Sequence, residues 1–217
     1  MLPRLHLITD DAVLASPGFL DGARWVLREQ GAGVALHLRG HGTSAGILYE
    51  LARALVAEAR ETGGWVLVND RVDVALAVGA AGVQLGRRSI PVRAARDVLG
   101  AGARIGYSAH DPDEAAAAGR DGADFIVLGA IWETASHPGE RPAGLELLRA
   151  ATARAAAPII AIGGVTPERV AEAVATGAYG VAVLGGVWRA ADPAAAAAAY
   201  REALQAAEGR CATSRTA

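Results

Sequence analysis

The sequence predicts a protein of the α/β class that folds as a single (β/α)8 barrel, the TIM-barrel architecture. Short apolar runs alternate with Ala-, Leu-, Arg- and Glu-rich segments at helical spacing along the whole chain, and eight such units can be counted. A helix between consecutive strands favours parallel pairing through right-handed crossovers. No Gly-x-Gly-x-x-Gly turn follows the first strand, so an open doubly wound sheet ranks second.

The elements follow from apolar periodicity and from start and stop signals. We expect strands at residues 5–9, 34–39, 65–69, 82–85, 104–108, 125–129, 159–163 and 180–184. We expect helices at residues 22–30, 44–62, 72–78, 91–99, 113–120, 144–154, 167–176 and 193–207. Thr166 and Asp192 each precede a proline, which is typical of a capped helix start. Gly31, Gly79 and Gly177 stand where helices should end.

Length and composition indicate one domain. The 217 residues suit a compact barrel, and 52% hydrophobic residues with 27 glycines suit an aliphatic core joined by tight turns. We expect the barrel to span residues 1–207. Residues 208–217 lack an apolar period, so we expect a disordered tail there.

Charge and cysteine content limit the kinds of partner that the protein is expected to bind. A net charge of −2 leaves no broad basic surface for a nucleic acid, and no basic cluster suggests a membrane surface. The single cysteine, Cys211, excludes a disulfide framework and a thiolate metal site. No signal peptide or membrane-spanning run is recognisable, so we expect a cytoplasmic protein with a small-molecule partner. The oligomeric state stays open, a homo-oligomer included.

Unusual residues at strand ends carry the functional prediction, because barrel active sites form at the C-terminal ends of the strands. Polar residues gather there at 9–10, 37–41, 69–70, 84–87, 108–110 and 133–137. Gly163-Gly164 and Gly185-Gly186 end the last two strands, where backbone N–H groups can hold an anion. We therefore predict a phosphate site at these four glycines; the alternative is that each pair only shapes a turn.

Several segments together resemble one family. They are Asn69-Asp70-Arg71-x-Asp73-x-Ala75, Gly82-Val83-Gln84-Leu85-Gly86, Ile105-Gly106-x-Ser108-x-His110, Leu128-Gly129 to Thr134, Pro138-Gly139, Gly144-Leu145 and Ala161-Ile162-Gly163-Gly164. Over residues 5–188 the chain resembles thiamin-phosphate synthase and its TenI-like relatives. The resemblance implies a thiazole phosphate held at Gly164, Gly185 and Gly186, and it assigns Asn69, Ser108 and Thr134 to substrate binding.

The chain departs from the synthase pattern at three places. Synthases carry Gln-x-Arg-x-Lys where this chain has His37-Leu38-Arg39-Gly40-His41, and Thr-x-Thr-Lys where it has Thr134-Ala135-Ser136-His137. Gly86-Arg87-Arg88-Ser89 stands in place of Gly-Gln-x-Asp, whose aspartate is a magnesium ligand. Asp70 then remains as a lone carboxylate, which makes a poor magnesium site, and Arg87 would repel a cation there. We expect no cofactor, with Mg²⁺ relevant only to a synthase.

These departures favour proton transfer over group transfer. The tautomerase branch isomerises a carboxythiazole phosphate, and histidine both accepts and donates protons near neutrality. We predict His137 as the base, His37 or His41 as its assistant, and Arg39 as the partner of the substrate carboxylate. His110 matches a position shared by the whole family, and a role in orienting a loop is equally compatible with it.

Other interpretations remain open at this point. A divergent synthase that releases pyrophosphate ranks second, and a non-catalytic thiazole-phosphate-binding or regulatory barrel ranks third. Isomerases and epimerases of sugar phosphates rank fourth. His37, His41 and His137 are alternatively ordinary polar loop residues, while a zinc site formed by them ranks lower still because their spacing is unfamiliar. Trp132 and Trp188 fit an apolar wall for a heterocycle or simple packing at the rim.

Overall fold

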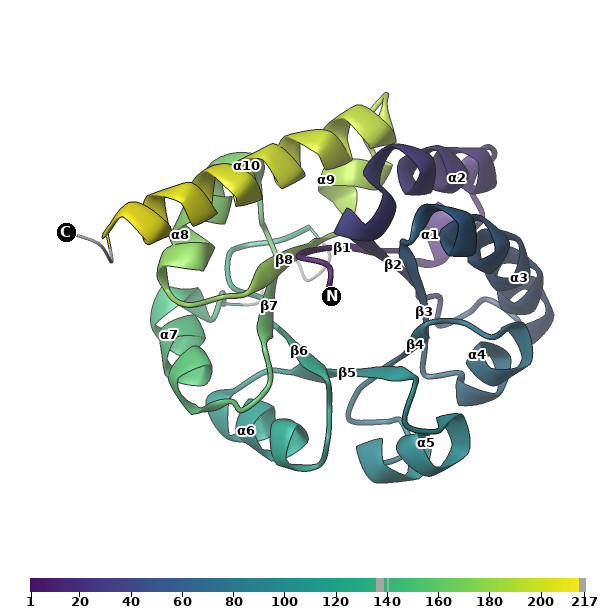
Figure 1. The fold of residues 1–217 in the computed structure, drawn as a ribbon, viewed down its shortest axis with the longest axis horizontal. Helices are drawn as coiled ribbons and strands as arrows, with labels where there is room; N and C mark the ends of the chain where they lie inside the picture. Colours follow the sequence, from purple (N-terminus) through teal and green to yellow (C-terminus); the bar gives the residue numbers. More distant parts are fainter. Residues whose placement is uncertain (136–138, 140, 215–217) are drawn as a thin grey trace.

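The chain folds as a closed parallel barrel. The computed structural model describes residues 1–135, 139 and 141–214. Eight strands follow one another around the barrel in chain order, and the first pairs with the last (Figure 1). They are β1 (Leu5–Ile8), β2 (Val34–Leu38), β3 (Trp65–Asn69), β4 (Gly82–Leu85), β5 (Arg104–Ala109), β6 (Phe125–Leu128), β7 (Ile159–Ile162) and β8 (Gly180–Val183). The predicted (β/α)8 barrel is confirmed, and every strand ends within one residue of its predicted range.

Helices surround the barrel as a ring (Figure 1). They are α1 (Asp11–Leu14), α2 (Phe19–Gln30), α3 (Ala45–Thr62), α4 (Val72–Val78), α5 (Val92–Leu99), α6 (Pro112–Arg120), α7 (Gly144–Arg154), α8 (Val170–Ala175), α9 (Gly185–Trp188) and α10 (Pro193–Ser214), with 3-10 turns η1 (Gly31–Gly33) and η2 (Pro167–Arg169). All eight predicted helices are present, the one at 167–176 as η2 followed by α8. None of the described helices is both long enough and apolar enough to cross a membrane.

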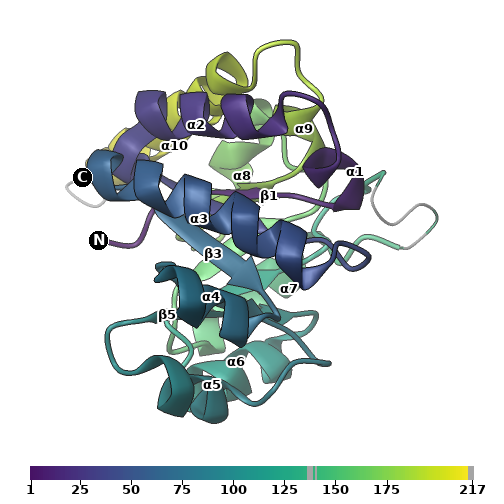
Figure 2. The ribbon, with the colours of Figure 1, turned by 90° about the vertical axis from the view of Figure 1, so that its right-hand side faces the viewer.

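Two short helices were not predicted. The single turn α1 is capped by Asp10, whose side chain accepts a hydrogen bond from the Val13 backbone N–H at 2.8 Å. It lies at the end of the barrel opposite the N-terminus of the chain (Figure 2). The other, α9, is a four-residue helix that follows β8 directly. Both are too short for apolar periodicity to reveal.

The last helix also differs from the prediction, since α10 continues to Ser214 where we expected a disordered tail from residue 208. Ala207 is buried, and the Glu208 carboxylate forms an ion pair with the Arg4 guanidinium. These contacts join the far part of α10 to the chain's first residues. A polar helix end held by tertiary contacts needs no apolar period of its own.

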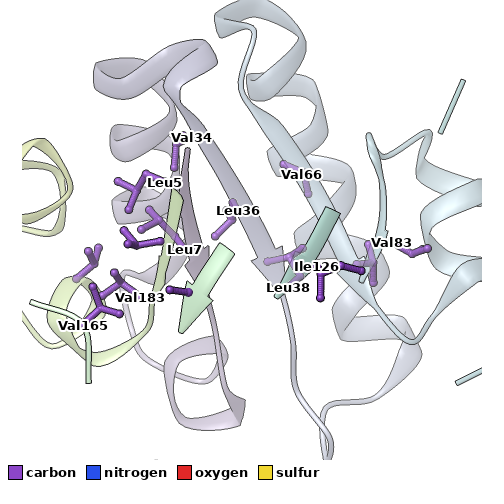
Figure 3. Close-up of a cluster of buried hydrophobic side chains, with 14 of the residues drawn as sticks. Leu5, Leu7, Val34, Leu36, Leu38, Val66, Val83, Ile126, Val165 and Val183 are labelled. Carbon is purple, nitrogen blue, oxygen red and sulfur yellow. The ribbon is translucent and has the colours of Figure 1, made fainter. Parts of the chain in front are cut away.

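The strand residues point alternately outward and inward, so the core has one part outside the barrel and one part inside it. Outward-facing side chains such as Leu5, Leu7 and Leu36 pack under the helices (Figure 3). Inward-facing side chains fill the barrel, and they include Leu67, Phe125 and the fully buried polar residues His6, His37 and Gln84.

The strand registers order these inward residues into layers, as in other barrels of this class. The layer nearest the C-terminal ends contains Ile8, Asn69, Ser108 and Ile162. The next contains His37, Gln84, Val127 and Ala182. Polar side chains on β2 to β5 therefore form one side of the upper interior.

Candidate active site

The first glycine pair follows β7 in a backbone conformation that glycine favours. Gly163 and Gly164 have φ angles of 96° and 63°. A Cβ on Gly163 would stand 2.6 Å from the Ala130 Cα atom, and one on Gly164 would stand 2.3 Å from the Glu133 carbonyl oxygen. The neighbouring backbone is held there because the Trp132 N–H donates to the Gly163 carbonyl at 3.0 Å. Both the left-handed backbone and the close approach require glycine.

Arg169 holds the same turn from the other side. Its guanidinium donates to the Gly164 carbonyl oxygen at 2.7 Å and lies 5.6 Å from the centroid of the Trp132 ring. The rim above β7 therefore combines two glycines, a cation and an aromatic face. Trp132 does border the predicted phosphate glycines. Trp188 packs edge-on against Phe19, with 5.3 Å between ring centroids.

The second glycine pair begins α9, directly after β8. The first N–H groups of a helix have no intrahelical acceptor, so those of Gly185 and Gly186 suit an anion. A Cβ on Gly186 would stand 2.2 Å from the Tyr200 hydroxyl oxygen, so packing against α10 also requires glycine there. A Cβ on Gly185 would make only ordinary contacts. The fold thus places both predicted glycine pairs on adjacent strands.

Arg39 and His41 come together after β2. The Arg39 Nη2 atom lies 2.7 Å from the His41 Nε2 atom, and the His41 side chain is exposed. Buried Thr9 fixes the end of the strand, because the Arg39 N–H donates to its hydroxyl oxygen at 2.8 Å. The Asp11 carboxylate accepts hydrogen bonds from the Thr43 hydroxyl and the Gly42 N–H, which lower the pKa of Asp11. This places a cation and an imidazole at the rim.

His37 does not lie at the rim, where we expected it. It is the fourth residue of β2 and points into the barrel, because strand positions alternate between the interior and the helix layer. Its Nε2 atom lies 2.8 Å from the Nδ1 atom of His6. Burial lowers the pKa of His37 well below its ordinary value, with the neighbouring His6 adding to the effect. His37 is therefore a neutral hydrogen-bonding group in the interior.

Three buried polar side-chain atoms on consecutive strands have no hydrogen-bond partner among the described residues. They are His37 Nδ1, Asn69 Oδ1 and Gln84 Oε1. Asn69 and Gln84 stand opposite each other across β3 and β4, and the Gln84 amide donates to the Ser108 hydroxyl at 2.9 Å. A buried acceptor without a partner costs about 1–3 kcal/mol, so these three atoms on β2, β3 and β4 would be stabilised by a ligand with N–H or O–H groups.

Asp70 and Ser89 lie together where the synthase pattern has its magnesium-binding carboxylates. Asp70 is exposed at the end of β3 with a φ of 61°, and its carboxylate accepts a hydrogen bond from the Ser89 hydroxyl. No cluster of three or more His, Cys, Asp or Glu side chains suited to a metal occurs within residues 1–135, 139 and 141–210. Mg²⁺ in phosphoryl sites is bound through one or two carboxylates plus substrate phosphates, so Asp70 fits this ion only together with a phosphorylated ligand.

Arg87, which the sequence predicts to repel a cation at Asp70, forms an ion pair with Glu114. Its guanidinium is paired with Glu114, at 2.6 Å from Nε to Oε1, and this contact raises the pKa of Arg87. Glu114 also accepts from the His110 backbone N–H at 2.8 Å. The His110 ring lies 3.2 Å from the Gly129 carbonyl oxygen, a contact between the ends of β5 and β6 that fits a loop-orienting role.

The remaining predictions concern the connection after β6. Thr134 lies on it and is partly buried, whereas His137 and Ser136 lie outside the described residues. Among the described residues, the alternative zinc site has no support, because His37 lies inside the barrel against His6 and His41 contacts Arg39. Gln84 was recognised as a strand-end residue but given no role in the site, and Arg169 was missed. A polar residue at an inward position of an apolar strand was the available signal for Gln84; Arg169 has none in the sequence.

Comparison with known proteins adds independent information. A family model described as thiamine monophosphate synthase matches residues 5–187. A thiamine-phosphate synthase of Salinispora arenicola is 43% identical, covering 94% of this chain and 98% of that protein, and one of Moorella thermoacetica is 42% identical over 83% and 86%. The solved structure of a thiamine phosphate pyrophosphorylase from Pyrococcus furiosus superimposes with a TM-score of 0.81 at 32% identity, covering 94% and 96% of the two chains.

Proposed function

Because the chain belongs to the thiamine monophosphate synthase family, we propose that it joins an aminopyrimidine diphosphate to a thiazole phosphate and releases pyrophosphate. The sequence ranks this transferase second to a thiazole tautomerase. Relatives at 42–43% identity that bear the synthase name favour the transferase. The interior position of His37 also removes one of the three histidines on which the tautomerase ranking depends.

One observation carries the proposal: the unpartnered acceptors His37 Nδ1 and Asn69 Oδ1 below the rim. An aminopyrimidine has an exocyclic amino group with two N–H donors, which match such acceptors. A carboxythiazole phosphate has a carboxylate and a phosphate, which are acceptors themselves. Acceptors facing acceptors would leave buried polar groups unpaired, so the interior favours the aminopyrimidine.

The reaction then needs little proton chemistry from the protein. The thiazole ring nitrogen supplies the electron pair for a new C–N bond to the pyrimidine methylene carbon. The diphosphate leaves with the electron pair of the broken C–O bond. In this proposal Gly163, Gly164, Gly185 and Gly186 hold the thiazole phosphate, and Arg39 contacts the diphosphate, whose charge grows as it leaves. Thr134 and Ser108 remain predicted substrate contacts.

Asp70 would hold Mg²⁺ in company with the diphosphate oxygens. When bound, Mg²⁺ neutralises charge on the departing diphosphate. Ser89 occupies the position of a second carboxylate in the synthase pattern, and its hydroxyl donates to Asp70. We infer that this chain binds Mg²⁺ weakly without the diphosphate and depends on the substrate to complete the coordination.

Binding measurements, which need no turnover, test whether the buried acceptors bind the amino group of the pyrimidine. We expect the wild-type protein to bind an unreactive aminopyrimidine alcohol about tenfold more tightly than the analogue that lacks the amino group, because one paired buried acceptor contributes on the order of 1.4 kcal/mol. Calorimetric titration of both compounds measures this ratio. Equal affinity for the two analogues would contradict the assignment of the acceptors to the pyrimidine.

Arg169→Gln should weaken the thiazole phosphate site selectively. Loss of the charged contact to Gly164 loosens the turn and removes a cation beside the phosphate, so we expect KM for thiazole phosphate to rise about tenfold, for a charge-assisted hydrogen bond of about 1.5 kcal/mol. KM for the aminopyrimidine diphosphate should stay within about twofold. Arg154→Gln, which loses an exposed ion pair with Asp113, is the matched control. Parallel rises of both KM values would contradict this role.

A further inference from the structure

His6 lies on β1 inside the barrel, and it reaches the proposed pyrimidine site only through His37. Its side chain is fully buried, and its ring centroid lies 5.0 Å from those of both His37 and Phe125. His6 pairs with Ala35 across the sheet, whereas His37 stands two residues further along β2. His6 therefore contacts the His37 ring from the side of the N-terminal ends of the strands.

The hydrogen bonds of these two rings determine where their protons lie. The His6 Nε2 atom is 3.0 Å from the Pro3 carbonyl oxygen, which only accepts, so His6 carries its proton on Nε2. The His6 Nδ1 atom of a neutral ring is then an acceptor. It lies 2.8 Å from His37 Nε2, so His37 must donate from Nε2. The remaining His37 atom, Nδ1, is an acceptor.

Both rings are neutral at physiological pH, as this assignment requires. Burial lowers the pKa of His6 to about 4, although the hydrogen bond to Pro3 opposes the change. Burial also lowers the pKa of His37 well below its ordinary value, and the neighbouring His6 adds to the effect. Each ring gains a proton only when the pH falls to its lowered pKa, so near neutrality each carries a single ring proton.

We propose that His6 is a positioning residue that locks His37 in the Nε2–H tautomer, so that His37 Nδ1 is a permanent acceptor for the amino group of the pyrimidine. The two nitrogens lie on different edges of the imidazole ring, so a ring that donates to His6 directs Nδ1 away from it. This inference rests on the proposed function for the identity of the ligand. The tautomer itself follows from the Pro3, His6 and His37 contacts between two neutral rings, whatever the ligand is.

Without His6, the opposite tautomer would become accessible. His37 would then carry its proton on Nδ1 and present a donor to an amino group that also donates. The lock therefore acts on the pyrimidine half of the reaction and leaves the thiazole phosphate site, on β7 and β8, unchanged. A purely structural role for His6 would not be expected to affect the pyrimidine site alone.

Nitrogen NMR of histidine-labelled, ligand-free protein tests the lock directly. We expect His37 to show a pyrrole-type Nε2 and a pyridine-type Nδ1 signal in the wild type. His6→Leu removes the acceptor and should give mixed tautomers, whereas His6→Asn places an amide oxygen near the former Nδ1 position and should restore the wild-type pattern. Phe125→Leu alters packing against both rings without changing a hydrogen bond, and it should also keep the pattern.

Binding of the aminopyrimidine alcohol and of its analogue without the amino group completes the test. We expect His6→Leu to weaken the amino compound about tenfold while leaving the other within about twofold, and His6→Asn to stay within about threefold of wild type, for a hydrogen-bond difference near 1.4 kcal/mol. A protonated Nδ1 in wild-type His37, or an unchanged pattern in folded His6→Leu, would overturn the lock. Wild-type protein that shows the lock but prefers neither compound would overturn the pyrimidine assignment instead.

Discussion

Asp70→Asn will lower kcat/KM for the aminopyrimidine diphosphate by about 100-fold or more, because a metal's stabilisation of transition-state charge is worth several kcal/mol and each 1.36 kcal/mol is tenfold in rate. The carboxylate stands at the end of β3 with one hydroxyl beside it, and no cluster of three or more His, Cys, Asp or Glu side chains supports it in the described part of the chain. Initial rates at varied Mg²⁺ concentration measure the loss.

Ser89→Asp is the complementary variant. It places a second carboxylate next to the first, so the Mg²⁺ concentration for half-maximal rate should fall about tenfold, as one added charged ligand is expected to contribute on the order of 1.4 kcal/mol. Asp97→Asn removes an exposed carboxylate on α5 and serves as the control. Full activity of Asp70→Asn, or the same Mg²⁺ dependence in Ser89→Asp and wild type, would contradict a metal role for this corner of the rim.

Gly164→Ala will damage the thiazole phosphate site and the fold together. The residue has a φ of 63°, which costs an alanine about 1–2 kcal/mol. The added Cβ would also stand 2.3 Å from the Glu133 carbonyl oxygen and 2.8 Å from the Trp132 Cβ atom, so the backbone must move. We expect KM for thiazole phosphate to rise about 100-fold and the free energy of unfolding to fall by about 2–4 kcal/mol.

Gly46→Ala is the control, and its expected effect on the free energy of unfolding has the opposite sign. Gly46 lies on α3 in open space, so alanine there should stabilise the protein by about 0.5–1 kcal/mol and leave both KM values unchanged. Denaturant unfolding and steady-state kinetics of the two variants measure both effects. A Gly164→Ala protein with wild-type KM for thiazole phosphate would show that this turn does not hold the phosphate.

The barrel itself could be predicted because each of its units repeats the same local signals. The apolar runs at 65–69 and 82–85 are strands of those same bounds, since β-branched and aliphatic residues buried on both faces give a continuous pattern. The position of the glycine pairs followed from their place after the last two strands. Both predictions depend on information within a few residues along the chain.

The unpredicted features depend on contacts between distant residues. The prediction that His37 lies at the rim is wrong because side chains alternate along β2, which places position 37 inside the barrel and Arg39 beyond the strand end. The Arg87–Glu114 pair joins residues 27 positions apart, so no local pattern reveals it. The hydrogen bond between His6 and His37 likewise appears only once β1 and β2 are paired.

Release of pyrophosphate is the most direct test of group transfer by this protein. Protein is incubated with Mg²⁺, aminopyrimidine diphosphate and thiazole phosphate, with each substrate alone as control, while pyrophosphate and the coupled product are quantified. We predict equal amounts of both products, at an enzyme-like rate, only when both substrates are present. Absence of pyrophosphate, with either isomerisation of a carboxythiazole phosphate or binding without turnover, would contradict the proposed synthase.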